Sequence, residues 1–86
     1  MYNEIVALLN EELEEDLLKD ITNIDQDDEL IEYGLDSLNL VKVVLAIEER
    51  YNIEFSEEEL EFENFSTLKR IINIIEKKRG DISDDE

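Results

Sequence analysis

The sequence predicts an all-α fold: a small four-helix bundle of three longer helices and one short helix, with a long loop after the first helix. Pro is absent and Gly occurs only at Gly34 and Gly80, so little in the chain would interrupt a helix. Apolar residues make up 42% of the 86 residues, and they recur at the steps of three and four that place them on one helix face. A chain of this length has room for one domain with one core.

The first helix is expected from Tyr2 to about Lys19, followed by a long loop. From Asp20 to Leu35 the helical rhythm is lost and Asp and Asn are frequent, which favours a loop with one short turn. A loop of this length in a small domain is usually functional or anchored to the core. The core stripe of the first helix comprises Ile5, Leu8, Leu9, Leu13 and Leu17. The residues expected to anchor the loop are Ile24, Leu30 and Ile31.

The second helix is predicted from Ser37 to Tyr51, with Asp36 or Ser37 as its N-cap. The side opposite its core face is also apolar, although a surface helix normally carries polar residues there. Either this helix is buried nearly all round, which is hard to achieve in so small a domain, or the apolar strip binds partners. The core face comprises Leu40, Val43, Val44, Ile47 and Tyr51, and the opposite strip comprises Leu38, Val41 and Leu45.

Two more helices are expected in the C-terminal half. Ser56 and Glu59 have the S-x-x-E spacing of a capping box, which predicts a short third helix. Ser66 is the expected N-cap of the last helix, and Gly80 fits the position after its end. Residues 1–80 are therefore predicted to form the domain, and residues 81–86 a disordered acidic tail. The core stripe of the last helix comprises Leu68, Ile71, Ile72 and Ile75.

Charge is the strongest feature of the composition. The 26 acidic and eight basic residues give a net charge of −18, which repels nucleic acid and anionic membranes and attracts proteins with basic patches. No apolar run approaches the length of a membrane span, and the N-terminus lacks the pattern of a secretion signal. We therefore expect a cytoplasmic monomer that binds neither nucleic acid nor membrane.

The absence of Cys and His limits the chemistry of the chain itself. It lacks a thiol nucleophile, the commonest general base and the commonest metal ligands, so neither catalytic residues nor a metal site are expected. Asp25, Asp27 and Glu29 alternate like calcium ligands. However, an EF-hand loop that began at Asp25 would need Gly and Glu where Leu30 and Asp36 stand.

The residues around Ser37 form a motif, Gly34-Leu35-Asp36-Ser37-Leu38, near the middle of this acidic chain. A phosphate on Ser37 would lie at a helix N-terminus, where free N–H groups and the helix dipole favour it. The stretch EYGLDSLNLVKVVLAIEERYNIEF and the later FSTL resemble the acyl carrier protein and peptidyl carrier protein family, and the resemblance covers about residues 3–78. The alternative is an acidic helical adaptor in which Ser37 is an unmodified helix cap.

The resemblance implies that a phosphopantetheinyl transferase uses coenzyme A and Mg²⁺ to attach 4′-phosphopantetheine to Ser37. The thiol of this arm would then carry acyl, aminoacyl or peptidyl groups as thioesters, so residues 1–80 would be a carrier domain and not an enzyme. Asp36 matches the motif acid that helps to engage the transferase and its metal. The positions that match the family's contacts with the basic patches and apolar docking sites of loading enzymes and synthases are Leu38, Val41, Lys42, Leu45, Glu48 and Glu49.

Two residues depart from the pattern of carriers in fatty acid synthesis, because Asn39 and Lys42 stand where those carriers usually place acids. Lys42 would reverse the charge that a basic synthase patch reads, or it is a solvated residue that pairs with acids three or four positions away. Phe62 and Asn64-Phe65 also resemble carriers of peptide or specialised pathways. The sequence thus favours a dedicated pathway (polyketide, nonribosomal peptide or specialised lipid) over housekeeping fatty acid synthesis.

Overall fold

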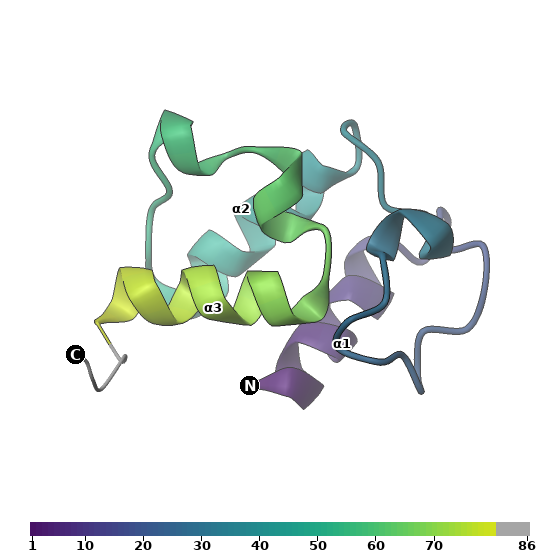
Figure 1. Ribbon diagram of the computed structural model, residues 1–86. Coiled ribbons are helices and arrows are strands. Elements are labelled where there is room, and N and C mark those ends of the chain that lie inside the picture. Colours follow the sequence, from purple (N-terminus) through teal and green to yellow (C-terminus); the bar gives the residue numbers. More distant parts are fainter. Residues whose placement is uncertain (81–86) are drawn as a thin grey trace.

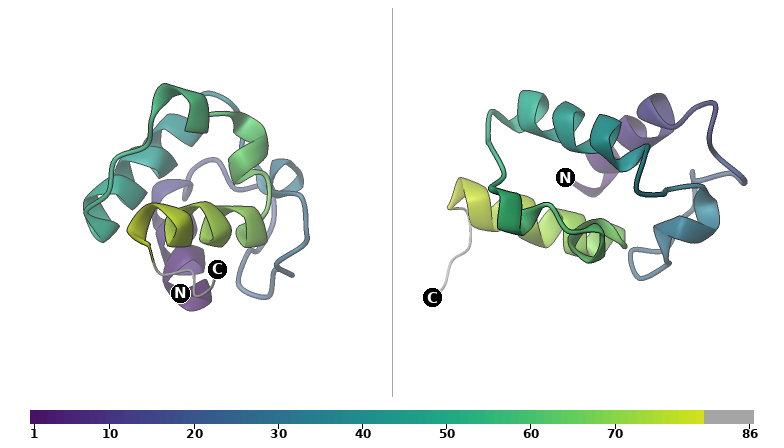
Figure 2. Two further views of the ribbon diagram at one scale, coloured as in Figure 1. Left: turned by 60° about the vertical axis from the view of Figure 1, so that its left-hand side comes forward. Right: turned by 90° about the horizontal axis from the view of Figure 1, so that it is seen from above.

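The computed structural model describes residues 1–80, and it confirms the all-α class: this part of the chain contains helices and turns but no strand. The α-helices are α1 (Tyr2–Glu12), α2 (Leu40–Tyr51) and α3 (Leu68–Arg79). The short 3-10 helices are η1 (Leu30–Tyr33), η2 (Glu57–Glu59) and η3 (Phe62–Phe65). α2 and α3 run in nearly the same direction, because the segment with η2 and η3 returns the chain to the start of α3 (Figure 1; Figure 2).

The core forms where α1 packs against both α2 and α3, and η3 covers α3. The loop between α1 and α2 adds its own buried residues to this core. Phe55 and Phe65 meet edge to face, with ring centroids 5.3 Å apart, an arrangement that aromatic pairs prefer. Most of the expected helix stripes are buried, whereas Leu17, Tyr51 and Ile72 are only partly buried and lie against the edge of the core.

The first helix ends at Glu12, so the prediction that it extends to about Lys19 is wrong. Leu13 keeps its side chain in the core, but the backbone turns there, and the Asp16 N–H donates to the Leu13 carbonyl at 2.7 Å. The Leu18 N–H then donates to the carbonyl of Tyr33 in η1 at 3.0 Å. This contact between distant segments replaces the helical hydrogen bond that Leu18 would otherwise make.

The loop is anchored by Ile24 and Leu30, as expected, but not by Ile31. The Ile31 side chain is 56% exposed, whereas Ile24 and Leu30 are 3% and 1% exposed. Leu30 and Ile31 are adjacent in a 3-10 helix, in which successive side chains point about 120° apart. Burying one of them therefore turns the other toward solvent.

The C-terminal half follows the predicted order with two differences. The capping box of Ser56 and Glu59 is present, but it opens the single turn η2, and η3 follows as a separate turn. The N-cap of α3 is Thr67 and not Ser66: Thr67 Oγ1 accepts the Arg70 N–H, whereas the Ser66 hydroxyl donates to the Glu63 carbonyl. The helix ends as expected, with Gly80 in the left-handed conformation at φ 72°. The predicted acidic tail, residues 81–86, lies outside the described residues.

Candidate functional site

Ser37 lies on the turn between η1 and α2, where it is exposed. The turn is closed by the Asp36 carbonyl, which accepts the N–H of Leu40, the first residue of α2, at 3.0 Å. It begins at Gly34, whose φ of 117° suits a residue without a Cβ. The motif residues thus place the Ser37 hydroxyl in front of the second helix.

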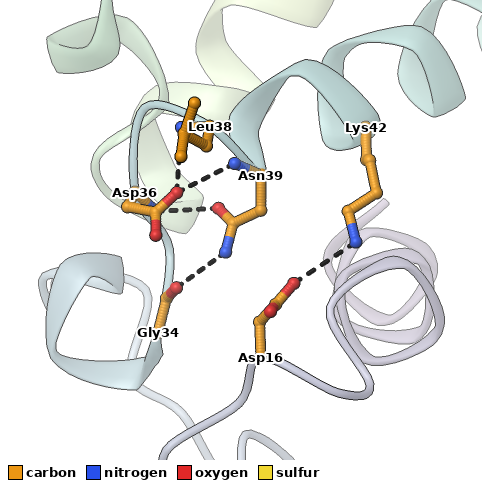
Figure 3. A network of polar contacts seen from close by, with 6 residues as sticks. All are labelled: Asp16, Gly34, Asp36, Leu38, Asn39 and Lys42. Carbon is orange, nitrogen blue, oxygen red and sulfur yellow. Dashed lines mark hydrogen bonds and ion pairs between the residues drawn. The ribbon is translucent and has the colours of Figure 1, made fainter.

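The side chains of Asp36 and Asn39 cap this turn reciprocally (Figure 3). Asp36 Oδ1 accepts the N–H groups of Leu38 and Asn39 at 2.9 and 2.8 Å. In return, Asn39 Oδ1 accepts the Asp36 N–H at 2.7 Å. Although α2 begins at Leu40 and not at Ser37, Asp36 satisfies the free N–H groups before it, as one of the two expected N-caps would.

Asn39 is buried, with only 6% of its surface exposed. Its Nδ2 donates to the Gly34 carbonyl at 2.9 Å, so the whole side chain is used inside the turn. This residue therefore presents no group to partners, and its role was missed from the sequence. The spacing Asp-x-x-Asn, which matches that of a capping box, was the available signal.

The segment after α1 supports the same turn (Figure 3). A Cβ on Gly34 would lie 2.3 Å from the backbone oxygen of Asp16, so only Gly allows these two segments to come so close. Lys42 Nζ lies 3.3 Å from Asp16 Oδ2, and both side chains are partly exposed. The alternative in which Lys42 pairs within its own helix is therefore wrong, because its partner lies 26 residues earlier in the chain.

The apolar strip of α2 is exposed, so the alternative of a helix buried all round is wrong. The exposed fractions are 85% for Leu38, 58% for Val41 and 59% for Leu45. Beside this strip and Ser37 lies a groove of about 330 Å³ between α2 and the segment that follows η2. Leu60, 42% exposed, adds an apolar side chain that the sequence reasoning did not include. The groove is lined by Ser37, Leu40, Val41, Val44, Leu45, Glu48, Leu60 and Phe62.

The two acids near the end of α2 differ in their surroundings. Glu48 is partly buried, and its Oε2 accepts the Phe55 N–H at 2.9 Å, which ties the loop after α2 to the helix. Glu49 is exposed. The Glu49 carboxylate is thus freely displayed, whereas the Glu48 carboxylate also stabilises the loop.

These features define the class of protein: a small helical domain with an exposed serine on a capped turn beside an apolar surface. The chain belongs to the phosphopantetheine attachment site family, whose model matches residues 3–75. Residues 3–75 accordingly form a carrier domain with an attachment site for a 4′-phosphopantetheine prosthetic group, and this domain itself is non-catalytic.

The chain is also similar to proteins with the name acyl carrier protein. The chain is 42% identical over 45 residues to the acyl carrier protein of Buchnera aphidicola subsp. Acyrthosiphon pisum (strain Tuc7), a match that covers 52% of this chain and 54% of that protein. It therefore spans about half the length of that relative. The acyl carrier protein of Coprothermobacter proteolyticus is 33% identical over 66 residues, which cover 70% of this chain and 78% of that protein.

Proposed function

We propose that Ser37 is the residue that carries the 4′-phosphopantetheine arm. The observation that carries this proposal is the position of its exposed hydroxyl on the capped turn before α2. The other two serines within residues 1–80 are used in the fold: Ser56 closes the capping box of η2, and Ser66 is buried and bonded to Glu63. The groove beside Ser37 offers an apolar surface next to the attachment point.

The proposed modification is a phosphoryl transfer from coenzyme A. The Ser37 oxygen forms a bond to the phosphorus that bears the pantetheine arm, and the pyrophosphate bond of coenzyme A breaks. Adenosine 3′,5′-bisphosphate leaves, and the serine proton passes to a base of the transferase. Mg²⁺ on the transferase would neutralise the phosphate charges. Asp36, whose Oδ1 already caps the turn, is proposed to help engage the transferase and its metal.

Intact mass spectrometry tests the assignment of Ser37. Incubation with coenzyme A, Mg²⁺ and a broad-specificity transferase is expected to add one arm of about 340 Da to the protein. Ser37→Ala is expected to remain unmodified, while Ser56→Ala is expected to be modified like the wild type. Modification of Ser37→Ala would assign the arm to another residue. An unmodified wild type would favour the adaptor function instead.

We further propose that residues 1–80 act as a monomeric cytoplasmic carrier domain whose partners dock on α2. Leu38, Val41 and Leu45 supply the exposed apolar contacts, and Glu49 supplies a free carboxylate for basic patches. None of the helices in this part of the chain has the length and apolar character needed to cross a bilayer. The net charge of −18 adds long-range attraction toward basic enzymes.

The favoured context is a dedicated pathway for a polyketide, a nonribosomal peptide or a specialised lipid. Lys42 supports this context, because its ammonium group lies at the surface of α2, where a basic synthase patch would meet it. Asn39 no longer contributes to this argument, since it is buried. Housekeeping fatty acid synthesis is the alternative. Loading assays with a fatty acid ketoacyl synthase system and with acyl- or aminoacyl-activating enzymes distinguish the two, because only the matching partner is expected to load the arm efficiently.

A further inference from the structure

The backbone on both sides of Ser37 is held by two side chains (Figure 3). The Asp36 carboxylate holds the side after Ser37, through the N–H groups of residues 38 and 39. The Asn39 amide holds the side before Ser37, through the Gly34 carbonyl and the Asp36 N–H. Ser37 itself contributes its side chain to neither of these contacts. The backbone at Ser37 is therefore held in place by the side chains of Asp36 and Asn39.

The position of Asn39 requires an acceptor and a donor at the same time. One of its terminal atoms faces the Asp36 N–H at 2.7 Å, and the other faces the Gly34 carbonyl at 2.9 Å. Only the amide arrangement with the oxygen toward the N–H and the nitrogen toward the carbonyl satisfies both. An ionised Asp of the same shape could accept but not donate, and its charge would face the Gly34 oxygen. A buried polar group left without its partner is costly, which gives these bonds their importance.

The Asn39 contact also connects the turn to the segment that follows α1, at Asp16. Gly34, which receives the Asn39 N–H, packs against the Asp16 backbone, and Asp16 pairs with Lys42, one turn beyond Asn39 on α2. The connections form a closed circuit from α2 through Gly34 and the segment after α1, and back to α2 (Figure 3). A displacement of the turn would therefore break the amide contacts of Asn39.

We infer that Asn39 is a positioning residue for the modification of Ser37: it fixes the turn in the form that presents the hydroxyl to the transferase. This inference rests on the proposed function, in which Ser37 is the attachment residue. A nucleophile must be held within a fraction of an ångström of its reactive geometry, and small displacements lower the rate steeply. Asn39 lies out of reach of partners, so it acts through the backbone and not through contact with the transferase.

Two variants of the full chain test this inference. Asn39→Asp keeps the shape and the acceptor but loses the donor, and Asn39→Leu keeps the approximate shape but loses both. Their modification by a broad-specificity transferase with coenzyme A is measured at several carrier concentrations. We expect kcat to fall by at least about fivefold, in line with the loss of one buried hydrogen bond. KM is expected to change by less than about twofold, because the apolar strip remains intact.

A matched control separates positioning from loss of stability. Thr67→Ala removes the N-cap bond of α3 to Arg70, and this destabilises the domain without altering the turn at Ser37. It is expected to keep the wild-type kcat when all variants are compared well below their melting temperatures. Amide hydrogen exchange gives a direct readout: the Asp36 N–H should exchange faster in Asn39→Leu than in Thr67→Ala, because only the first variant removes its acceptor.

The outcomes are distinguishable. If both Asn39 variants fold and retain the wild-type kcat, Asn39 does not position Ser37, and the attachment residue still stands. Asn39 is also excluded as a positioning residue if Thr67→Ala lowers kcat as much as the two Asn39 variants do, because the loss of stability alone would then explain the lower kcat. Modification of Ser37→Ala, or an unmodified wild type, would instead contradict the proposed function. Should Asn39→Leu fail to fold, Asn39→Asp decides, since it retains the contact to the Asp36 N–H.

Discussion

The same substitution at two valines of α2 gives opposite predictions for stability. Val41 and Val44 lie three residues apart on one helix, but Val41 is 58% exposed and Val44 is 7% exposed. Replacing either by Ser removes the same atoms and changes helix propensity by the same small amount. Any difference between the two variants therefore reports the burial of each position and its role in docking.

The structure sets the size of the expected difference. Full burial of a Val side chain stabilises a protein by about 1.5–3 kcal/mol, and a buried hydroxyl without a partner costs about 1–3 kcal/mol more. Val44→Ser should therefore lower the free energy of unfolding by about 2.5–6 kcal/mol. At Val41 less than half of the surface is buried and the hydroxyl stays in water, so Val41→Ser should cost less than about 1 kcal/mol.

Two assays read the two properties of each variant. Urea unfolding, with the m-value held common to all variants, gives the change in stability, and a melting curve should show a shift of about 4–8 °C for each kcal/mol. Modification by the transferase and loading by an acyl-transferring enzyme give kcat/KM. If the apolar strip docks partners, Val41→Ser should lower kcat/KM in both reactions, although its fold is nearly as stable as the wild type.

One result would refute this reasoning about the two faces of α2. If Val41→Ser destabilised the domain as much as Val44→Ser, and partner rates changed only in proportion to the unfolded fraction, both sides of α2 would belong to the core. Leu45→Ser provides an independent repeat, because Leu45 is 59% exposed on the same strip.

Three further changes test the surroundings of the site and the packing of α3. Gly34→Ala should destabilise by more than the roughly 1–3 kcal/mol of a strained backbone conformation, because its Cβ would lie 2.3 Å from the Asp16 oxygen; wild-type stability in urea would contradict that close approach. Lys42→Glu should raise kcat/KM with a basic ketoacyl synthase by more than the neutral variant Lys42→Gln does. Loss of the exposed ion pair with Asp16 should cost less than about 1 kcal/mol of stability. Equal rates for both variants and the wild type would mean that Lys42 does not select partners. The pKa of Glu59 is lowered by the backbone N–H of the capping box and by the Lys78 ammonium group 3.0 Å away. The ionised Glu59 carboxylate therefore stabilises the fold above the usual pKa of 4.5, and this contribution is lost as the pH falls through the lowered value. The difference in unfolding free energy between wild type and Glu59→Gln should shrink as the pH falls below 4.5, and a constant difference would exclude this linkage.

The features that could be predicted from the sequence are those set by local spacing. The apolar steps along α2 and α3 indicate which faces pack inward, so the all-α class follows without knowledge of the tertiary contacts. The apolar strip with Val41 was also recognised, but whether it is exposed or buried was decided only by the structure. The capping box at Ser56 and the left-handed Gly80 depend on residues within one turn, and both are present. Ser37 and its motif acid Asp36 could be proposed in the same way, because the motif is contiguous in the chain.

Other features depend on groups that are distant in the chain, and only folding brings these groups together. The apolar rhythm of the first helix continues through Leu17, yet α1 ends at Glu12, and in the segment that follows the Leu18 N–H bonds to the distant Tyr33 carbonyl. The sequence could not show this competing hydrogen bond. For the same reason only acids within its own helix were considered as ion-pair partners of Lys42, whereas folding places Asp16 beside it. The burial of Asn39 depends on the Gly34 carbonyl lying within reach of its amide. That distance exists only once the turn around Ser37 has formed.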